Sequence, residues 1–447
     1  MKKLLLWLLI AILSIFMIAS FSLAGCKAAA EEAAVEEAAP AEAAVEETKA
    51  EGKVVLVVRT SPEEEGLRVT AAEYTKKTGV DIEIVEIGRE GYLTAVMTQL
   101  IAGTSDYDVV WFLSTSIAEM AEAGVLQPLD DYMNDPNLTD PEEFDKEDLL
   151  ATYGYKGVTY GIPQTISTNY LYYREDLIPN PPQTWDEYLE VAKEFTKSIN
   201  PDSPTTYGTV WDCLPGEELP KCFYSILWTC KGDLIDDDGN VLINSPASIE
   251  AANWVVKFID TGIFPEDILT YGYTEVFEAL QTGEVAMAGP MWDAAMGGIL
   301  VGDSPYKDVI KVTSIPGIEE NGEIYRVPFQ HSWCLVLNKN SENLEEAWKF
   351  LNYATSKEGG KITAVASGSS PARVSLLTDP ELLEAFPHYK LHAESLAISK
   401  SEPSVTFYES MHDTMNTALT KIITGELSPK DAFDTAASEL QALLQAQ

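Results

Sequence analysis

Short apolar segments alternate with amphipathic helices between residues 54 and 112, and this order restricts the chain to few architectures. Val54–Val58 is a continuous apolar run, typical of a strand covered on both faces. Residues 80–85 alternate apolar and acidic side chains, and residues 108–112 form a third strand segment. Helices are predicted at 61–79, where Ser61 and Glu64 form a capping box, and at 92–102. This strand–helix series predicts a parallel sheet with helices on its faces.

Polar residues follow the first and third of these strands. Ligands of open parallel sheets bind outside the carboxyl ends of the strands. Those ends carry Arg59 and Ser61 in one case, and Phe112, Ser114 and Thr115 in the other. Ser61 also begins a helix, whose free backbone N–H groups can hold a polar ligand atom. We therefore expect Ser61 to be a helix cap first and a ligand contact second.

A second α/β stretch begins near Gly161. Residues 163–169 are polar and lead into a strand at 171–173, and Thr184–Glu187 is a further capping box that opens a helix. Later helices are predicted at 251–259, 276–281, 344–355 and 429–444, and strands at 285–287 and 334–337. The roughly 400 residues after position 52 are enough for two lobes or domains.

The first 26 residues have the order of a secretory signal. Lys2 and Lys3 precede an apolar run, 4–21, and the small-residue sequence LAGC ends at Cys26. The run is long enough for a membrane span, but small residues directly before a cysteine favour cleavage. The pattern resembles a bacterial lipobox, so residues 1–25 are expected to be removed and Cys26 to carry lipid. Residues 26–52, rich in Ala and Glu, are expected to be a disordered tether that holds an extracytoplasmic protein at the cell membrane.

Charge and cysteine content narrow the range of partners. The net charge is −41, and no basic patch of the kind that nucleic-acid binders need is visible. Besides Cys26 the chain has four cysteines, of which Cys213 and Cys222 flank a short loop. Export would permit a disulfide between these two. Cys230 and Cys334 lie in apolar surroundings, as buried thiols do.

Motifs of enzymes and metal sites are missing from the sequence. It has no G-x-S-x-G, H-E-x-x-H, P-loop or G-x-G-x-x-G segment. His388 and His392 are four residues apart, but Pro387 before them indicates a helix start and a chance pair. Residues 236–240 fit a hairpin turn better than a calcium loop, because Leu234 and Ser245 would fill its first and last positions. We expect no catalysis, no cofactor and no metal.

Several segments, in a fixed order, resemble the family 1 extracellular solute-binding proteins, which include sugar-binding lipoproteins. They are YKGVTYGIP at 155–163, LYYREDL at 171–177 with PPQTWDE at 181–187, FEALQTGEVAM at 277–287 with Gly289 and Trp292, and AWKFL at 347–351 with Ser356 and PAR at 371–373. Each motif is loose, but together they cover nearly all of residues 53–447.

The resemblance implies an α/β protein with the two-lobe fold of periplasmic binding proteins, type II-like, and a ligand cleft between the lobes. Lobe 1 would comprise 53–163 with 327–372, and lobe 2 would comprise 168–320 with 376–447. The lobes would close around a solute by a hinge motion. The closed monomer would then dock on the transmembrane permease of an ABC importer.

A sugar site needs aromatic rings for stacking and polar groups with fixed hydrogen-bond geometry. By position, the resemblance implies Trp292, Asp293 and Trp333 as cleft residues beside Phe112, Ser114 and Thr115. Gln164, Ser167 and Asn169 stand where the family often has an acidic sugar ligand, and this departure argues against maltodextrin. The other aromatic candidates are Tyr224, Trp228 and Tyr408.

The preferred interpretation is a transport protein for a mono- or oligosaccharide. Amino acids and polyamines are alternative solutes, although a polyamine would need several carboxylates in the cleft. A lipid-anchored glycoside hydrolase is a second alternative, because carboxylates are abundant. A sensor module that binds a membrane receptor is the third.

Overall fold

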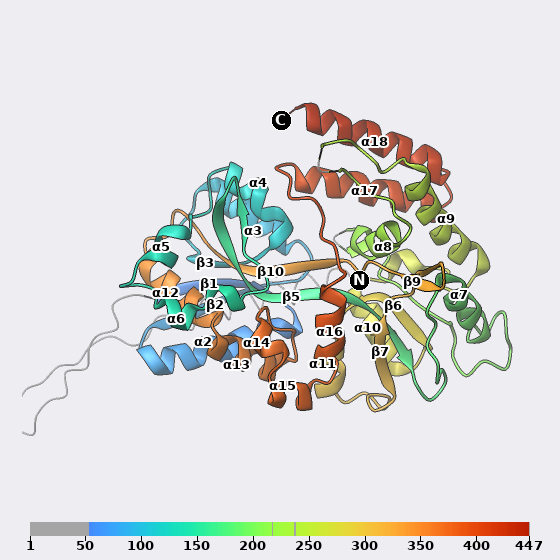
Figure 1. Ribbon diagram of the computed structural model, residues 1–447, viewed down its shortest axis with the longest axis horizontal. Helices are drawn as coiled ribbons and strands as arrows, with labels where there is room; N and C mark the ends of the chain where they lie inside the picture. Colours follow the sequence, from blue (N-terminus) through green and yellow to red (C-terminus); the bar gives the residue numbers. More distant parts are fainter. Residues whose placement is uncertain (1–52, 217, 237, 447) are drawn as a thin grey trace, which may run out of the picture. The chain divides into compact units, whose positions relative to one another are not determined.

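Strand β5 (Val158–Arg174) runs through two groups of strands in the computed structural model, which describes residues 53–216, 218–236 and 238–446 (Figure 1). Up to Thr168 it pairs with β4 (Tyr153–Tyr155) and β10 (Gln330–Leu337), both antiparallel. From Asn169 onward it pairs with β6 (Met287–Trp292) and β7 (Ile310–Ser314). We call the first group of strands, with the helices packed on it, the first lobe, and the other group the second lobe.

The first lobe confirms the predicted parallel sheet. β1 (Lys53–Arg59) pairs in parallel with β2 (Asp81–Ile87) and β3 (Val109–Leu113), and β10 continues the sheet antiparallel to β3. Helices α2 (Pro62–Thr78) and α3 (Tyr92–Ala102) follow β1 and β2. Ser61 caps α2 by accepting a hydrogen bond from the Glu64 N–H at 3.2 Å, and Gly79 ends it in the left-handed conformation.

Helices from a later part of the chain, after it has passed through the second lobe, also pack on the first lobe. The helices α12 (Leu344–Ala354) and α13 (Lys357–Ser367) pack against α2, far from it in sequence. Its shorter helices are α4 (Ile117–Glu122), α5 (Asp130–Asn134) and α6 (Pro141–Phe144). Further along the chain, α14 (Val374–Leu377) and α15 (Pro380–Ala385) pack on α13, and α16 (Tyr389–Leu396) packs on both β5 and the second-lobe strand β7.

The second lobe is mostly helical. It contains α7 (Trp185–Glu194), α8 (Glu218–Thr229), α9 (Pro246–Thr261), α10 (Tyr273–Thr282), α11 (Ala294–Val301), α17 (Tyr408–Ile423) and α18 (Pro429–Gln445). α17 and α18 lie side by side, with α17 against α8 and α18 against α9 (Figure 1). A small hairpin, β8 (Ile318–Glu320) and β9 (Glu323–Tyr325), lies outside the main sheet. The helices predicted at 251–259, 276–281 and 429–444 are confirmed with longer bounds, and the helix predicted at 344–355 ends one residue earlier, at Ala354. The strand predicted at 285–287 begins only at Met287.

The cysteines require a correction to the sequence-based prediction. Cys213 and Cys222 are separate buried thiols, and the Cys222 thiol points to the Pro290 carbonyl at 3.4 Å. Both line a small cavity of about 10 Å³ beside Trp211. Proximity across the short loop therefore does not produce the expected disulfide, because Cys222 is turned toward the backbone of the neighbouring strand. Cys230 and Cys334 are buried thiols, as predicted.

Other predictions concern the turn at 236–240 and the N-terminus. Asp236 Oδ1 accepts hydrogen bonds from the N–H groups of Asp238 and Asn240, and Ile235 pairs antiparallel with Val241, which confirms the hairpin turn. In the described part of the chain, no helix is long and apolar enough to cross a membrane. The signal segment, Cys26 and the tether lie outside the described residues.

Candidate solute-binding site

Four of the predicted residues meet in a small inner chamber of about 10 Å³. Arg59 ends β1, Ser167 lies in β5, Trp292 ends β6 and Trp333 lies in β10, and all four line this chamber. The Arg59 guanidinium lies over the Trp333 ring, 4.1 Å from its centroid, and is almost fully buried. Strands of both lobes thus deliver these side chains to one place, and the residues themselves nearly fill it.

Trp292 is fixed on two sides. Its ring stacks on the His331 imidazole, with centroids 4.2 Å apart and planes 15° apart. Its Nε1–H donates to Glu218 Oε2 at 2.7 Å. One ring face and the only hydrogen-bond donor of the side chain are therefore engaged by the protein itself.

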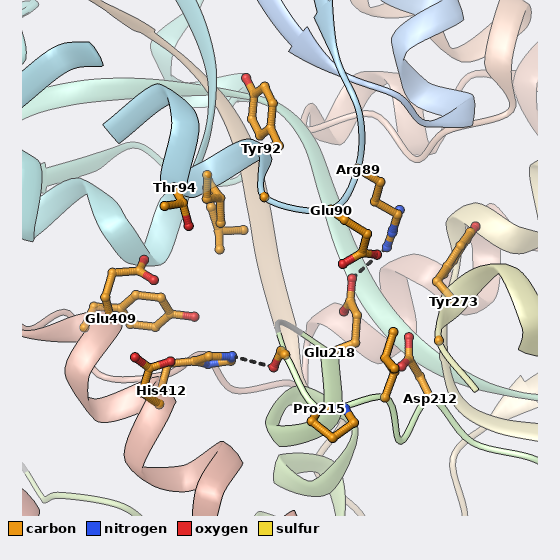
Figure 2. Close-up of a pocket in the computed structure, with 18 residues that line it drawn as sticks. Arg89, Glu90, Tyr92, Thr94, Asp212, Pro215, Glu218, Tyr273, Glu409 and His412 are labelled. Carbon is orange, nitrogen blue, oxygen red and sulfur yellow. Dashed lines mark hydrogen bonds and ion pairs between the residues drawn. The ribbon is translucent and has the colours of Figure 1, made fainter. Parts of the chain in front are cut away.

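A larger cavity of about 240 Å³ lies next to this chamber (Figure 2). Its walls come from both lobes. Residues 89–94 after β2 and Leu113 form one side, and the other side is formed by Asp212, 214–216, Glu218, 272–273, 408–409 and 412–413. The two spaces share Arg89, Glu218 and Tyr273. Of the predicted residues, Tyr408 lines the larger cavity, and its hydroxyl donates to Glu402 Oε2 at 3.0 Å.

An ion pair between the lobes separates the inner chamber from the larger cavity. Arg89 Nη2 lies 2.7 Å from Glu218 Oε1, and both side chains are at most one-fifth exposed. The Arg89 guanidinium also lies 4.4 Å from the centroid of the Tyr273 ring. Arg89 belongs to the loop after β2 and Glu218 is the first residue of α8, so the pair can form only when the lobes are close together.

Carboxylates dominate the cavity wall. Glu90, Asp212, Glu218, Glu409 and Asp413 line it, against Arg89 and His412 as the basic groups. Burial raises the pKa of Glu409, although Ser116 Oγ donates to its Oε1 at 3.0 Å. Burial alone would lower the pKa of His412, but the hydrogen bond and charge of Glu402 outweigh it, and the net shift is upward.

Asp293 lines neither space, and it joins the chain segments that cross between the lobes. Its Oδ1 accepts from the Thr168 N–H at 3.0 Å, and its Oδ2 accepts from Ser370 Oγ at 2.5 Å. Burial raises the pKa of this carboxyl to about 7. The contacts join β5, the end of β6 and the segment after α13, so the geometry gives Asp293 a bracing role at the junction of the lobes.

The other predicted residues line neither the inner chamber nor the larger cavity. Phe112 is buried in the core, Ser114 Oγ accepts from the Ser332 N–H at 3.0 Å, and Thr115 is buried close behind. Asn169 Oδ1 accepts from Ser225 Oγ at 2.9 Å. Tyr224 and Trp228 stack on each other, and Trp228 stacks on Phe329 at 5.7 Å.

Gln164 occupies an irregular position in β5. The register shifts between Trp333 and Cys334, which pair with Thr165 and Pro163, so Gln164 has no partner residue in β10. Its side chain is buried, and neither amide atom has a hydrogen-bond partner among the described residues. Bulges of this kind often occur next to functional sites.

Sequence reasoning missed most of the larger cavity. Arg89 follows the second parallel strand, so the rule that ligands bind at strand carboxyl ends could have indicated it. Asp212 directly precedes Cys213, and Glu218 lies between Cys213 and Cys222, in a segment that the sequence analysis considered only for its cysteines. Tyr273 and His412 carry no local signal that separates a cavity residue from a core residue.

Comparison with known proteins supports this description. A maltotriose-binding protein of Pyrococcus abyssi is 26% identical over 339 residues, which cover 74% of this chain and 69% of that protein. A galactooligosaccharide-binding protein of Bacillus subtilis is 21% identical over 418 residues, 90% of this chain and 92% of the relative. Among solved structures, maltose-bound MalE3 of T. maritima superposes with a TM-score of 0.79 at 25% identity, covering 88% of this chain and 99% of that one. A ribitol complex of an ABC transporter solute-binding protein from Agrobacterium radiobacter gives a TM-score of 0.78 at 22% identity, with 88% and 98% covered.

The fold and the cavity between two lobes define a solute-binding protein of the periplasmic type. Residues 60–361 match the bacterial extracellular solute-binding protein family, and the chain belongs to this family. Proteins of this kind bind a small solute and work with the permease of an ABC importer, and they are not enzymes.

Proposed function

We propose that this protein captures a sugar or sugar alcohol in the 240 Å³ cavity and delivers it to an ABC permease. The proposal rests on one observation. Both lobes line this cavity, and the Arg89–Glu218 ion pair joins the two lobes next to it. A solute that contacts both lobes binds the closed form better than the open form and shifts the population toward closure. The sugars and sugar alcohols in the related proteins support this class of solute.

Five sequence-predicted residues support a common site. Arg59, Ser167, Trp292 and Trp333 line the inner chamber, and Tyr408 lines the larger cavity next to it. We propose that the solute occupies the larger cavity and reaches the edge of Trp292 when Arg89 moves. In this proposal Asp293, Ser61 and Ser114 stabilise the fold rather than contact the solute. Gln164 and Asn169 carry buried amide nitrogens that have no hydrogen-bond partner among the described residues.

The lipid anchor and the boundary between the two lobes are part of the same proposal. Lipid on Cys26 and the Ala/Glu tether would hold a monomer outside the cell membrane, within reach of its permease. The change of β5 from one strand group to the other at Thr168–Asn169 supports lobes that divide between residues 163 and 168.

A thermal-shift screen of the purified protein tests the proposal. A ligand that binds only the folded state raises the melting temperature. We expect a rise of several degrees with at least one neutral sugar or sugar alcohol, and a smaller rise in Trp292→Ala. Trp254→Ala is the matched control, because Trp254 lies in α9, packs against Phe258 and does not line the cavity. Shifts only with amino acids would overturn the sugar assignment.

A further inference from the structure

Helix α17 of the second lobe begins without a capping side chain of its own. Its N-cap residue is Phe407, whose phenyl ring accepts no hydrogen bond. The first N–H groups of a helix have no partner within the helix, so an acceptor placed there stabilises it. Here the acceptor comes from the other lobe, because the Glu409 N–H donates to Glu119 Oε2 at 3.1 Å. Glu119 belongs to α4 of the first lobe and is 290 residues away in sequence.

A second hydrogen bond joins the start of α17 to the first lobe. Ser116, a buried residue at the end of the turn that follows β3, donates from its Oγ to Glu409 Oε1 at 3.0 Å. Burial raises the pKa of Glu119, and the backbone N–H groups of Glu409 and Tyr408 act against this shift. A carboxylate at this position also faces the positive end of the helix dipole. The first lobe therefore holds α17 through both the backbone and the side chain of Glu409.

The residues held in this way belong to the wall of the larger cavity. Tyr408 and Glu409, the first two residues of α17, both line it, whereas Glu119 does not. Figure 2 shows Glu409 on one side of the cavity and the contact between Arg89 and Glu218 on the other. Two contacts between the lobes thus flank the cavity, one an ion pair and the other a helix cap.

We infer that Glu119 is a positioning residue for solute binding, which caps α17 across the lobe boundary and so fixes Tyr408 and Glu409 in the wall of the closed cavity. The cap forms only when the lobes are close together, because its donor and its acceptor belong to different lobes. Solute binding and cap formation favour the same closed arrangement, so each strengthens the other. This inference rests on the proposed function and adds to it a residue that acts from outside the cavity.

Calorimetry with the sugar found in the thermal screen tests the role of Glu119 in binding. Glu119→Ala should bind this sugar roughly three- to tenfold more weakly, the scale of one lost helix cap. Glu119→Gln keeps an acceptor oxygen and loses only the charge, so it should recover part of the affinity, and it keeps the test valid if the alanine variant does not fold. Glu122→Ala is the matched control, since Glu122 lies in the same helix but pairs with the exposed Lys156. Equal affinities of Glu119→Ala and Glu122→Ala would overturn the inference.

Hydrogen exchange at the start of α17 distinguishes a cap across the lobes from a general loss of stability. In the wild type the sugar should slow exchange of the amides of residues 408–410, because the closed form holds the cap in place. Glu119→Ala should lose this protection by sugar and Glu122→Ala should keep it, with equal exchange in the rest of α17. Protection that persists in Glu119→Ala would overturn the inference. If no sugar binds the wild type, the proposed function fails, whereas unchanged exchange of these amides in solute-free Glu119→Ala overturns the cap alone.

Discussion

Arg89 and Glu218 are 129 residues apart in sequence, yet Arg89 Nη2 lies 2.7 Å from Glu218 Oε1 at the boundary of two cavities. Glu218 also accepts the Trp292 Nε1–H, so one carboxylate connects the first lobe to the aromatic wall of the inner chamber. Figure 2 marks this contact with a dashed line between the Arg89 and Glu218 side chains. The closed arrangement of the lobes is thus tied to a contact that solute binding could strengthen or replace.

Arg89→Ala is expected to weaken the closed form of the solute-free protein. Glu218 would lose a charge-assisted hydrogen bond, which is worth about 1.5–3 kcal/mol in a largely buried setting. Small-angle X-ray scattering should show a larger radius of gyration than in the wild type. Arg68→Ala is the control, since Arg68 pairs with Glu64 on the more exposed surface of α2, where such pairs contribute about 0–1 kcal/mol. Equal radii in the two variants would show that Arg89 does not hold the lobes.

Trp292 is expected to be an aromatic anchor of solute binding. Trp292→Ala should weaken binding by roughly 1–3 kcal/mol, the usual scale for such a residue. Trp292→Phe keeps the ring against His331 but loses the bond to Glu218, so it should fall between the wild type and the alanine variant. Calorimetry with the sugar found in the thermal screen measures both. Full affinity in a folded alanine variant would remove Trp292 from the site.

Asp293 should make stability fall as the pH rises toward neutral. Burial raises its folded-state pKa from 3.8 to about 7, so the folded protein binds more protons than the unfolded chain between these values. Its contribution is fully present below pH 3.8 and is lost as the pH rises through about 7. Asp293→Asn mimics the protonated form and should lack this loss. The free energy of unfolding of the variant minus that of the wild type should be larger at pH 8 than at pH 5, by more than about 1.4 kcal/mol, which corresponds to one pKa unit. Urea unfolding at the two pH values measures this change. A constant difference at both pH values would contradict this role.

His388 and His392 should have the opposite effect on stability, which should fall as the pH falls. Burial lowers their pKa values from 6.5 to about 4 and about 3, so the unfolded chain binds more protons in the range between. Their stabilisation is fully present above pH 6.5 and is lost as the pH falls toward 4. His388→Phe should therefore reduce the loss of stability between pH 7 and pH 4.5, measured by urea unfolding. Neither ring nitrogen of His388 has a hydrogen-bond partner among the described residues, so the substitution sacrifices no such bond. An unchanged slope with pH would indicate that His388 is already protonated in the folded state.

Local patterns were sufficient for the framework of the first lobe. The Gly79 stop and the apolar run at 54–58 act over a few residues and appear in the structure as predicted. Of the predicted Ser61–Glu64 capping box the structure shows the Ser61 half, because the Glu64 carboxylate accepts from Arg68 instead. Parallel pairing of β1, β2 and β3 follows from the same order, because strands joined by helices must run in one direction.

The binding cavity depended on contacts that no local pattern contains. Asp293 looked like a hydroxyl acceptor beside Trp292, but its neighbours in space are Thr168 and Ser370, so it braces the chain instead. The expected disulfide was wrong for a similar reason, since spacing brings two cysteines near each other but does not orient their thiols.

The sequence by itself determined the class of fold and the residues at the strand ends, because hydrophobic periodicity and helix caps are short-range effects. Only the tertiary structure decided which strand ends face a cavity, that Glu218 meets both Arg89 and Trp292, and that carboxylates from three distant segments surround the same space. These relationships depend on how two lobes pack across a junction, and the free energy of that packing is set by the whole chain rather than by any segment.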